Sequence, residues 1–325
     1  FYEHFFQYKY PFSKYDSAFC PEYNIGAMEN PGLVTFNDRF VFEEEVLREL
    51  KTAFATTIAH EASHMWFGDL VTMKWWNDLW LKESFADYIA YFCLSQVDLK
   101  KWDFENSWER LLKRKEWAYL EDQLTTTHPI AAVVENTEQA ETAFNGIVYA
   151  KGAAVLKQLF CLIGQERFGQ AAAKYFQKHA WGTATLDDFI DALKVMYKPQ
   201  DASYPSSFQV WQQSWLETPG LNSCRPKWNK DTNEIIIEQT SEHKIETLRY
   251  HKMKLAIFDS EAKIIEIKDI VLQNKKKTLI NYSQGLKNPA AVLLNYEDEA
   301  YIKVKLDLVS IKFFRNNLHK VDESL

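Results

Sequence analysis

The chain has 325 residues, of which 46% are hydrophobic and 26% are charged, so it has enough apolar material for a globular core and, by length, for about two domains. Its 38 Lys and Arg residues against 45 Asp and Glu residues give a formal net charge of −7, which argues against nucleic-acid binding through the phosphate backbone. No apolar stretch approaches the about 20 residues that cross a membrane as a helix, so we expect no membrane span in this chain.

The start of the chain and its cysteines bear on its origin. The chain begins at Phe1 without an initiating Met or a signal-peptide pattern, and we expect it to be a central fragment of a longer polypeptide. Its four cysteines are widely spaced and form no Cys-x-x-Cys pair, which favours reduced thiols. We therefore predict a cytoplasmic protein, and the sequence does not indicate an oligomeric state.

A helical pattern follows a first segment that is rich in aromatic and turn residues. Residues 33–36 and 40–42 resemble short strands around a turn at Asn37-Asp38. From Glu43 to Phe67 the spacing predicts a helix, whose apolar stripe consists of Leu47, Leu50, Phe54 and Ile58.

Helices are also predicted over most of the next 150 residues. A helix over residues 78–96 places Leu81, Phe85, Tyr88 and Phe92 on one stripe. Further helical stretches lie near residues 103–121, 147–163, 166–180, 185–197 and 206–217.

The pattern changes after Thr218-Pro219-Gly220. Residues 226–306 carry several strand patterns, of which 301–306 is the clearest, and they predict a small antiparallel sandwich that acts as a spacer without a site. The other strand patterns cover residues 235–237, 253–258, 264–267 and 291–294. Residues 308–325 again read as helical.

The strongest chemical motif is His60-Glu61-Ala62-Ser63-His64. Residues four apart share a helix face, so His60 and His64 can bind one Zn²⁺ together. Glu61 then lies beside the metal, where it can reach a water molecule rather than the ion. The alternative is an ordinary pair of surface or core histidines on a helix.

Glu83 is the candidate third ligand, because catalytic zinc needs three protein ligands and an open position. It lies nineteen residues after His64, near the start of the next predicted helix. A helix–turn–helix of that length folds it back against the histidines. The alternative is a solvated carboxylate, since helix starts favour acidic residues.

These residues resemble the zinc signature of the gluzincin metallopeptidases, and five further motifs resemble the aminopeptidase N family, most closely its actinobacterial-type branch. The likeness covers nearly the whole chain. The motifs lie at residues 26–30, 66–72, 80–86, 127–130 and 149–153.

The resemblance implies an α+β fold and a function. We expect a mostly helical, thermolysin-like catalytic domain over residues 1–222, a small antiparallel β-sandwich over 223–307 and the beginning of a C-terminal helical domain over 308–325. The implied activity is a zinc-dependent aminopeptidase that releases single amino acids from peptides with a free N-terminus. One Zn²⁺ per chain is expected.

The resemblance also assigns roles to single residues. His60, His64 and Glu83 would hold the zinc. Glu61 would act as general base, and the hydroxyl of Tyr149 would stabilise the oxyanion. The substrate would be bound by Gly26, Ala27, Met28, Glu29 and Asn30, with the Glu29 carboxylate on its α-amine.

Some positions depart from the family pattern. Ala62-Ser63 replaces Leu-Ala inside the zinc motif, Lys82 replaces the usual Asn before Glu83, and Pro31 follows the substrate motif. These differences bear on fine geometry and substrate preference, because none removes a ligand. Asp87 either orients a zinc-binding histidine or is a solvated acid, and His128 either borders the cleft or caps a turn.

Other functions stay open at this point. The main alternative is a catalytically impaired, peptide-binding relative or fragment of the same fold. An epoxide hydrolase is disfavoured, because that branch has Gly where Ala27 stands. A non-enzymatic helical scaffold would require all the motifs to coincide by accident. The preferred first residue of the substrate cannot be read from the sequence.

Overall fold

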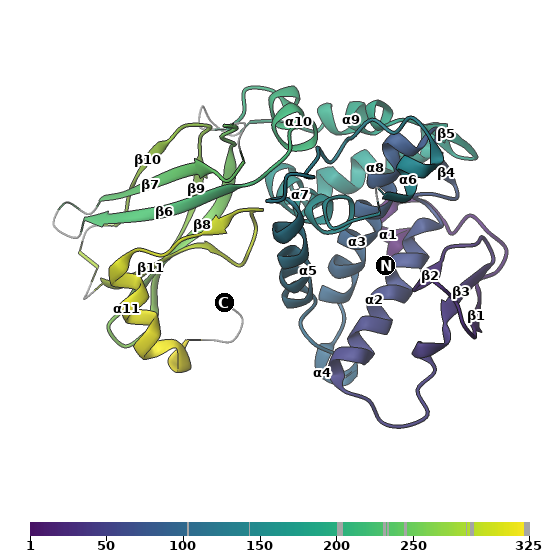
Figure 1. Ribbon diagram of the computed structural model, residues 1–325, viewed down its shortest axis with the longest axis horizontal. Coiled ribbons are helices and arrows are strands. Elements are labelled where there is room, and N and C mark those ends of the chain that lie inside the picture. Colours follow the sequence, from purple (N-terminus) through teal and green to yellow (C-terminus); the bar gives the residue numbers. More distant parts are fainter. Residues whose placement is uncertain are drawn as a thin grey trace. The chain divides into compact units, whose positions relative to one another are not determined.

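The protein is described by a computed structural model that covers all residues except 103, 143, 200–203, 230–231, 233, 244–245, 284, 287–288 and 322–325. The chain divides into two compact units (Figure 1). The helical unit comprises Phe1–Ala118, Ala131–Leu156 and Ile163–Tyr197. The sheet unit comprises Tyr119–Ile130, Lys157–Leu162 and Lys198–Leu325.

Helices dominate the chain up to Leu216. The helices are α1 (Tyr2–Phe6), α2 (Arg48–His64), α3 (Leu79–Ser95), α4 (Leu99–Trp102), α5 (Ser107–Glu121), α6 (Thr137–Thr142), α7 (Gly152–Ile163), α8 (Gln165–His179), α9 (Leu186–Lys194) and α10 (Phe208–Leu216). Short turns form η1 (Asp38–Phe40), η2 (Trp76–Asp78) and the π-helical η3 (Ile147–Lys151). Five strands accompany them: β1 (Asp16–Cys20), β2 (Ala27–Met28), β3 (Leu33–Asn37), β4 (Val71–Met73) and β5 (Gly182–Ala184).

Most of the predicted helices are confirmed to within a few residues, but the start of the chain differs from the prediction. The strand predicted at 40–42 is wrong, because the Asn37 side chain accepts a hydrogen bond from the Arg39 N–H (2.9 Å) and starts the turn η1 instead. The helix predicted from Glu43 begins at Arg48. Strands β1 and β2 were not predicted.

The helices α2 and α3 run side by side and form the centre of the helical unit (Figure 1). Nearly every side chain of α3 is buried. The buried face of α2 carries small residues, such as Thr52, Thr56 and Ala59. The threonine hydroxyls donate to carbonyls one turn earlier in α2, at 2.8 and 2.7 Å, so burial leaves them satisfied. The Thr52 hydroxyl also accepts a hydrogen bond from the Glu105 N–H (2.8 Å), and the Ala59 carbonyl accepts one from the Tyr2 hydroxyl (2.6 Å).

The predicted apolar stripe of the first long helix is only partly buried. Leu47, Leu50 and Ile58 are 74%, 48% and 38% exposed in the structure. The fourth residue, Phe54, packs against four phenylalanine rings of the segment before α2, from Phe19 to Phe42, so the stripe is covered only at this position.

An aromatic cluster supports the turn that follows α2. Phe67 lies just after the end of α2 and stacks on Phe85 of α3, with ring centroids 4.0 Å apart. Tyr175 and Phe176 from α8 and Phe189 from α9 surround this pair. Because such ring contacts are specific in geometry, they fix the backbone of Phe67 relative to α3.

The sheet unit contains two sheets. Their strands are β6 (Asn222–Asn229), β7 (Glu234–Ser241), β8 (His251–Asp259), β9 (Ile264–Leu272), β10 (Lys277–Asn281), β11 (Pro289–Tyr296) and β12 (Lys303–Val304). The orders are β10-β7-β6-β12 and β11-β8-β9. Buried side chains of both sheets, among them Ile235 and Leu255, belong to one apolar cluster.

The strand predictions for this unit are partly right. All pairings are antiparallel except that of β12, which runs parallel to β6 and spans only two residues of the predicted strand 301–306. Strands β6 and β10 were not predicted individually. Helix α11 (Leu308–Asn317) and the turn η4 (Leu318–Lys320) agree with the predicted helical end, of which residues 322–325 lie outside the described part. Phe314 of α11 packs edge-on against Phe258 of β8.

Two further expectations concern cysteines and membranes. All four cysteines, which are described, are free. Among the described residues, no single helix is both long and apolar enough to cross a membrane. The helices Ile147–Ile163 and Gln165–His179, which meet at a bend of 112°, are long and apolar enough only when they are taken together.

A buried polar group lies inside the sheet unit. The Arg249 guanidinium donates to the carbonyl oxygens of Ser214 (2.6 Å) and Pro219 (2.9 Å). The fully buried His251 lies 3.2 Å from the Asn222 side-chain oxygen. Burial, aided by the charge of Arg249, lowers the pKa of His251 from 6.5 to about 3.

We predict that His251 makes the sheet unit sensitive to acid. Below pH 6.5 the unfolded chain binds a proton at this residue, whereas the folded chain does so only near pH 3, so stability falls as the pH falls through that window. Each pKa unit is worth about 1.4 kcal/mol, and the total effect is several kcal/mol. In His251→Gln, urea unfolding should show a shallower loss of stability between pH 6.5 and 4. The exposed His319→Gln is the control, and equal pH dependence in both variants would contradict the assignment.

Candidate active site

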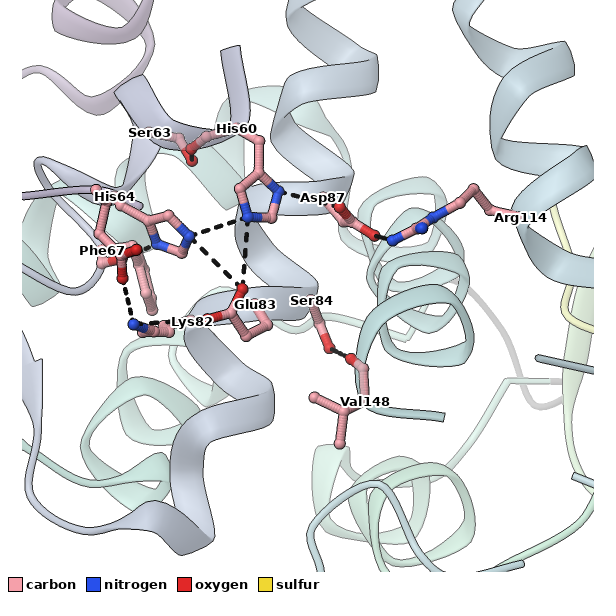
Figure 2. A network of polar contacts seen from close by, with 11 residues as sticks. His60, Ser63, His64, Phe67, Lys82, Glu83, Ser84, Asp87, Arg114 and Val148 are labelled. Atoms are coloured by element: carbon pink, nitrogen blue, oxygen red, sulfur yellow. Dashed lines mark hydrogen bonds and ion pairs between the residues drawn. The ribbon is translucent and has the colours of Figure 1, made fainter. Parts of the chain in front are cut away.

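The structure brings the three predicted zinc ligands together. His60 and His64 lie one turn apart near the end of α2, and their Nε2 atoms are 3.0 Å apart. Oε2 of Glu83, from the first turns of α3, lies 3.4 Å and 3.6 Å from these two nitrogens (Figure 2). One ligand atom from each residue lies within 4.8 Å of the others.

The outer nitrogens of the two histidines are both anchored. Nδ1 of His60 lies 3.0 Å from Oδ1 of Asp87, and Nδ1 of His64 lies 2.9 Å from the carbonyl oxygen of Phe67 (Figure 2). Because both partners are acceptors, each Nδ1 carries a hydrogen, and each Nε2 of a neutral ring turns a lone pair toward the other. Two lone pairs beside a carboxylate require a proton or a cation. Two imidazole nitrogens and one carboxylate are a donor set that fits Zn²⁺.

The pKa shifts of His60 and Glu83 agree with this need for positive charge. Burial would lower the pKa of His60, but hydrogen bonds to Asp87 and Glu83 raise it well above its usual value. Burial would raise the pKa of Glu83, but His64 and His60 hold it well below its usual range. The site therefore favours positive charge between its three donor groups.

Asp87 is buried and not a solvated acid. It bridges His60 and Arg114, whose Nη2 lies 2.8 Å from its Oδ2. Burial would raise the pKa of Asp87, whereas Arg114 and His60 lower it to about 2. The Arg114 guanidinium also lies 5.0 Å from the ring centre of Trp117 and 5.8 Å from that of Tyr149. Sequence reasoning missed Arg114, because nothing in its spacing on α5 distinguishes it from the other basic residues of that helix.

Two further carboxylates face the same space. Glu61 and Glu29 are both buried, and one ligand atom of each lies within 4.8 Å of one another and of His64. Burial raises the pKa of Glu61, although His60 and His64 oppose this effect. Burial would also raise the pKa of Glu29, but the charges of His64 and Lys82 lower it. Two neighbouring carboxylates thus differ in proton affinity, which is typical of groups with separate roles.

The segment that carries Glu29 lies at a sheet edge. Strand β2 is the last strand in the order β1-β3-β2, so among the described strands it pairs with β3 alone. The Gly26 carbonyl accepts a hydrogen bond from the Asn37 N–H (2.9 Å), and the Asn30 side chain donates to the Thr35 hydroxyl (3.1 Å). Gly26, Ala27 and Met28 are half-buried, whereas Asn30 is exposed.

Lys82, which sequence comparison marked as a departure, is part of the site. Its ammonium group pairs with the Glu29 carboxylate and lies 3.5 Å from Oε1 of Glu83. No local pattern predicts this contact, because Glu29 lies 53 positions earlier in the chain.

Tyr149 lies beside the cluster on the π-helical turn η3. Its ring centre is 6.4 Å from that of His60. Burial, the negative charges of Glu83 and Asp87 and a hydrogen bond to Glu83 raise the pKa of Tyr149, so the phenol stays protonated. It is therefore a hydrogen-bond donor at neutral pH.

A close packing contact holds the turn η3 against α3. The Ser84 hydroxyl donates to the Val148 carbonyl (Figure 2). Gly152 follows the turn, and a Cβ atom at this position would lie only 1.8 Å from Oγ and 2.7 Å from Cβ of Ser84. Glycine is thus required here for the close approach that places Tyr149.

His128 was a weaker candidate. It lies in the sheet unit, where its Nδ1 is 2.7 Å from the Pro129 carbonyl oxygen. A role at the substrate cleft stays a prediction.

Comparison with known proteins adds independent information. The Peptidase family M1 domain matches residues 1–215. Aminopeptidase N of Streptomyces lividans is 39% identical over 334 aligned positions, which cover 98% of this chain and 38% of that protein. The leucyl aminopeptidase of Saccharolobus solfataricus is 33% identical over 227 positions, which cover 69% of this chain and 28% of that protein. The chain therefore spans less than two fifths of the length of these curated relatives.

We predict that Gly152→Ala impairs the site while His60, His64 and Glu83 stay in place. The added methyl group overlaps Ser84, so the turn η3 must move away from α3 and carry Tyr149 with it. A displacement of about 1 Å costs up to about a hundredfold in turnover, and we expect a loss of ten- to hundredfold. Steady-state hydrolysis of an aminoacyl nitroanilide measures it, with metal content as a check on the histidines. Ser84→Ala, which removes the hydrogen bond and adds no clash, should lose less; wild-type turnover in Gly152→Ala would refute the packing argument.

Proposed function

The chain belongs to peptidase family M1, and we propose that it carries the catalytic centre of a zinc-dependent aminopeptidase that releases single N-terminal amino acids from peptides. The observation that carries the proposal is the meeting of the His60 and His64 Nε2 atoms with Glu83, next to the carboxylates of Glu61 and Glu29. The relatives include an aminopeptidase N and a leucyl aminopeptidase.

In this proposal His60, His64 and Glu83 hold one Zn²⁺ per chain. A bound ion would supply Lewis acidity toward water and toward the peptide carbonyl. The hydrogen bonds from the Nδ1 atoms keep both rings in the tautomer whose Nε2 can ligate.

Glu61 is the proposed general base. It follows His60 on α2, and its carboxylate faces the space next to His64. Its raised pKa suits a group that takes a proton from the attacking water and passes it to the leaving amine. Tyr149, which stays protonated, donates a hydrogen bond to the oxyanion that forms at the carbonyl.

Glu29 is the proposed contact for the free N-terminus. A buried carboxylate forms a charge-assisted bond with an α-ammonium group, and such bonds are strong when partly desolvated. The edge strand β2, with Gly26, Ala27 and Met28, would run beside the extended substrate in the manner of an added strand, while Asn30 supports the end of that strand. Met28 would line the pocket for the first side chain.

The proposal extends to the architecture. We assign residues 1–222 to a thermolysin-like catalytic domain, 223–307 to a β-sandwich and 308–325 to the beginning of a helical domain. The compact units of the structure differ from these boundaries, because they group residues 119–130, 157–162 and 198–222 and helix α11 with the sheets. The family match over residues 1–215 supports the first boundary, and the apolar cluster shared by two sheets supports the sandwich.

A peptide-binding protein with impaired catalysis is the second candidate. Hydrolysis itself, measured together with metal content, distinguishes the two candidates.

We expect the purified protein to contain about one zinc per chain, and Glu61→Gln to keep the zinc while losing hydrolysis. General-base catalysis contributes about a hundred- to ten-thousandfold, so turnover should fall by that factor. Elemental analysis gives the zinc content. His60→Ala removes one of the proposed ligands, so this variant should contain no zinc. The exposed Glu49→Gln on the same helix is the control. Near-normal turnover in Glu61→Gln would exclude this residue as the base, and zinc-bound protein without any hydrolysis would favour the second candidate.

We also expect N-acetylated peptides to resist cleavage. Acetylation removes the positive charge that Glu29 binds, so chromatography should detect free leucine from Leu-Gly-Gly and none from its acetylated form. Glu29→Gln should raise KM for the free peptide by about ten- to hundredfold, because bonds to charged groups contribute about 1.5–3 kcal/mol. Equal cleavage of both peptides would remove Glu29 from its role.

A further inference from the structure

The amine-binding carboxylate of the proposed site already has a cation beside it. Lys82 immediately precedes Glu83 on α3, and its ammonium group pairs with Glu29 and lies 3.5 Å from Oε1 of Glu83. We propose that Lys82 occupies the place of the substrate's α-ammonium group in the peptide-free protein, and that it thereby sets how tightly free N-termini bind. This inference rests on the proposed function.

The burial of the pair explains why the contact forms. The Glu29 side chain is 8% exposed and the Lys82 side chain 19%, so both charges are largely removed from water. A buried carboxylate without a partner is costly, and here it also faces Glu61 across the same space. Lys82 supplies the compensating charge from a backbone position that α3 fixes.

Lys82 also has room to leave Glu29. Its stem passes Gly68, where a Cβ atom would lie 3.5 Å from its Cδ. It lines a pocket of about 320 Å³ whose other walls include Thr72, Met73 and Trp75. A lysine has a flexible four-carbon stem, so its ammonium group can move into this pocket when a substrate amine reaches Glu29.

Two ammonium groups then compete for one carboxylate. Binding a free N-terminus breaks the Lys82–Glu29 pair, and the measured affinity is the difference between the two interactions. Removing the charge of Lys82 should therefore tighten the binding of peptides with a free amine. The effect must vanish when Glu29 is absent, since Lys82 acts through that carboxylate.

Equilibrium binding tests the proposal without depending on turnover. The variants are made in the zinc-loaded Glu61→Gln protein, and calorimetry measures the binding of Leu-Gly-Gly and its N-acetylated form. Lys82→Met, which keeps the stem and removes the charge, should bind the free peptide about three- to tenfold more tightly. The control Lys74→Met changes another, exposed lysine of the same pocket and should bind as the parent does.

The second arm adds Glu29→Gln, in whose presence Lys82→Met should no longer alter the binding of the free peptide. The role of Lys82 would be overturned if Lys82→Met bound the free peptide equally well or more weakly. It would also be overturned if the gain in affinity persisted with Glu29→Gln or extended to the acetylated peptide. Either result leaves the proposed function standing. If the parent binds neither peptide and the wild-type protein cleaves no aminoacyl substrate, the proposed function fails, and this inference fails with it.

Discussion

The two hydrogen bonds on the outer nitrogens of His60 and His64 are the constraint on which the site depends. They fix the tautomers and turn both Nε2 atoms inward, to 3.0 Å from one another. Each bond requires a different part of the fold. The bond to Asp87 requires α3 to lie close to α2, as the two helices do. The bond to the Phe67 carbonyl requires the turn after α2 to be held in place, and the stacking of Phe67 on Phe85 supplies that support.

The buried carboxylates around His60 and His64 are compensated by neighbouring cations. Buried acids surround the two histidines, and two cations lie on opposite flanks of them. Arg114 serves Asp87 and lies near the ring of Tyr149, whereas Lys82 serves Glu29 and Glu83. A buried carboxylate whose negative charge is not fully compensated binds a proton more tightly. Burial and the charge of Glu29 raise the pKa of Asp69 to about 7 in this way. A divalent cation between the ligands would offset the same excess of negative charge.

The sequence predicts the parts of this site that follow from local periodicity and fails where tertiary distance decides. His60 and His64 meet because residues four apart share a helix face, and the structure brings Glu83 to them as its spacing suggested. The pairs Lys82–Glu29 and Arg114–Asp87 join residues 53 and 27 positions apart, and no local pattern predicts them. Most long helices were predicted within a few residues. Three of the four residues of the predicted apolar stripe, Leu47, Leu50 and Ile58, are exposed, and periodicity alone does not reveal this.

The distribution of the site over the fold also matters. The residues that surround the paired histidines, from Glu29 to Tyr149, all belong to the helical unit, whose aromatic cluster is its own. The sheet unit has a separate apolar core and separate buried polar groups, Arg249 and His251. The positions of the His60, His64 and Glu83 donor atoms are therefore a property of how α2 and α3 pack together, and that of Tyr149 depends on the π-helical turn η3 beside them.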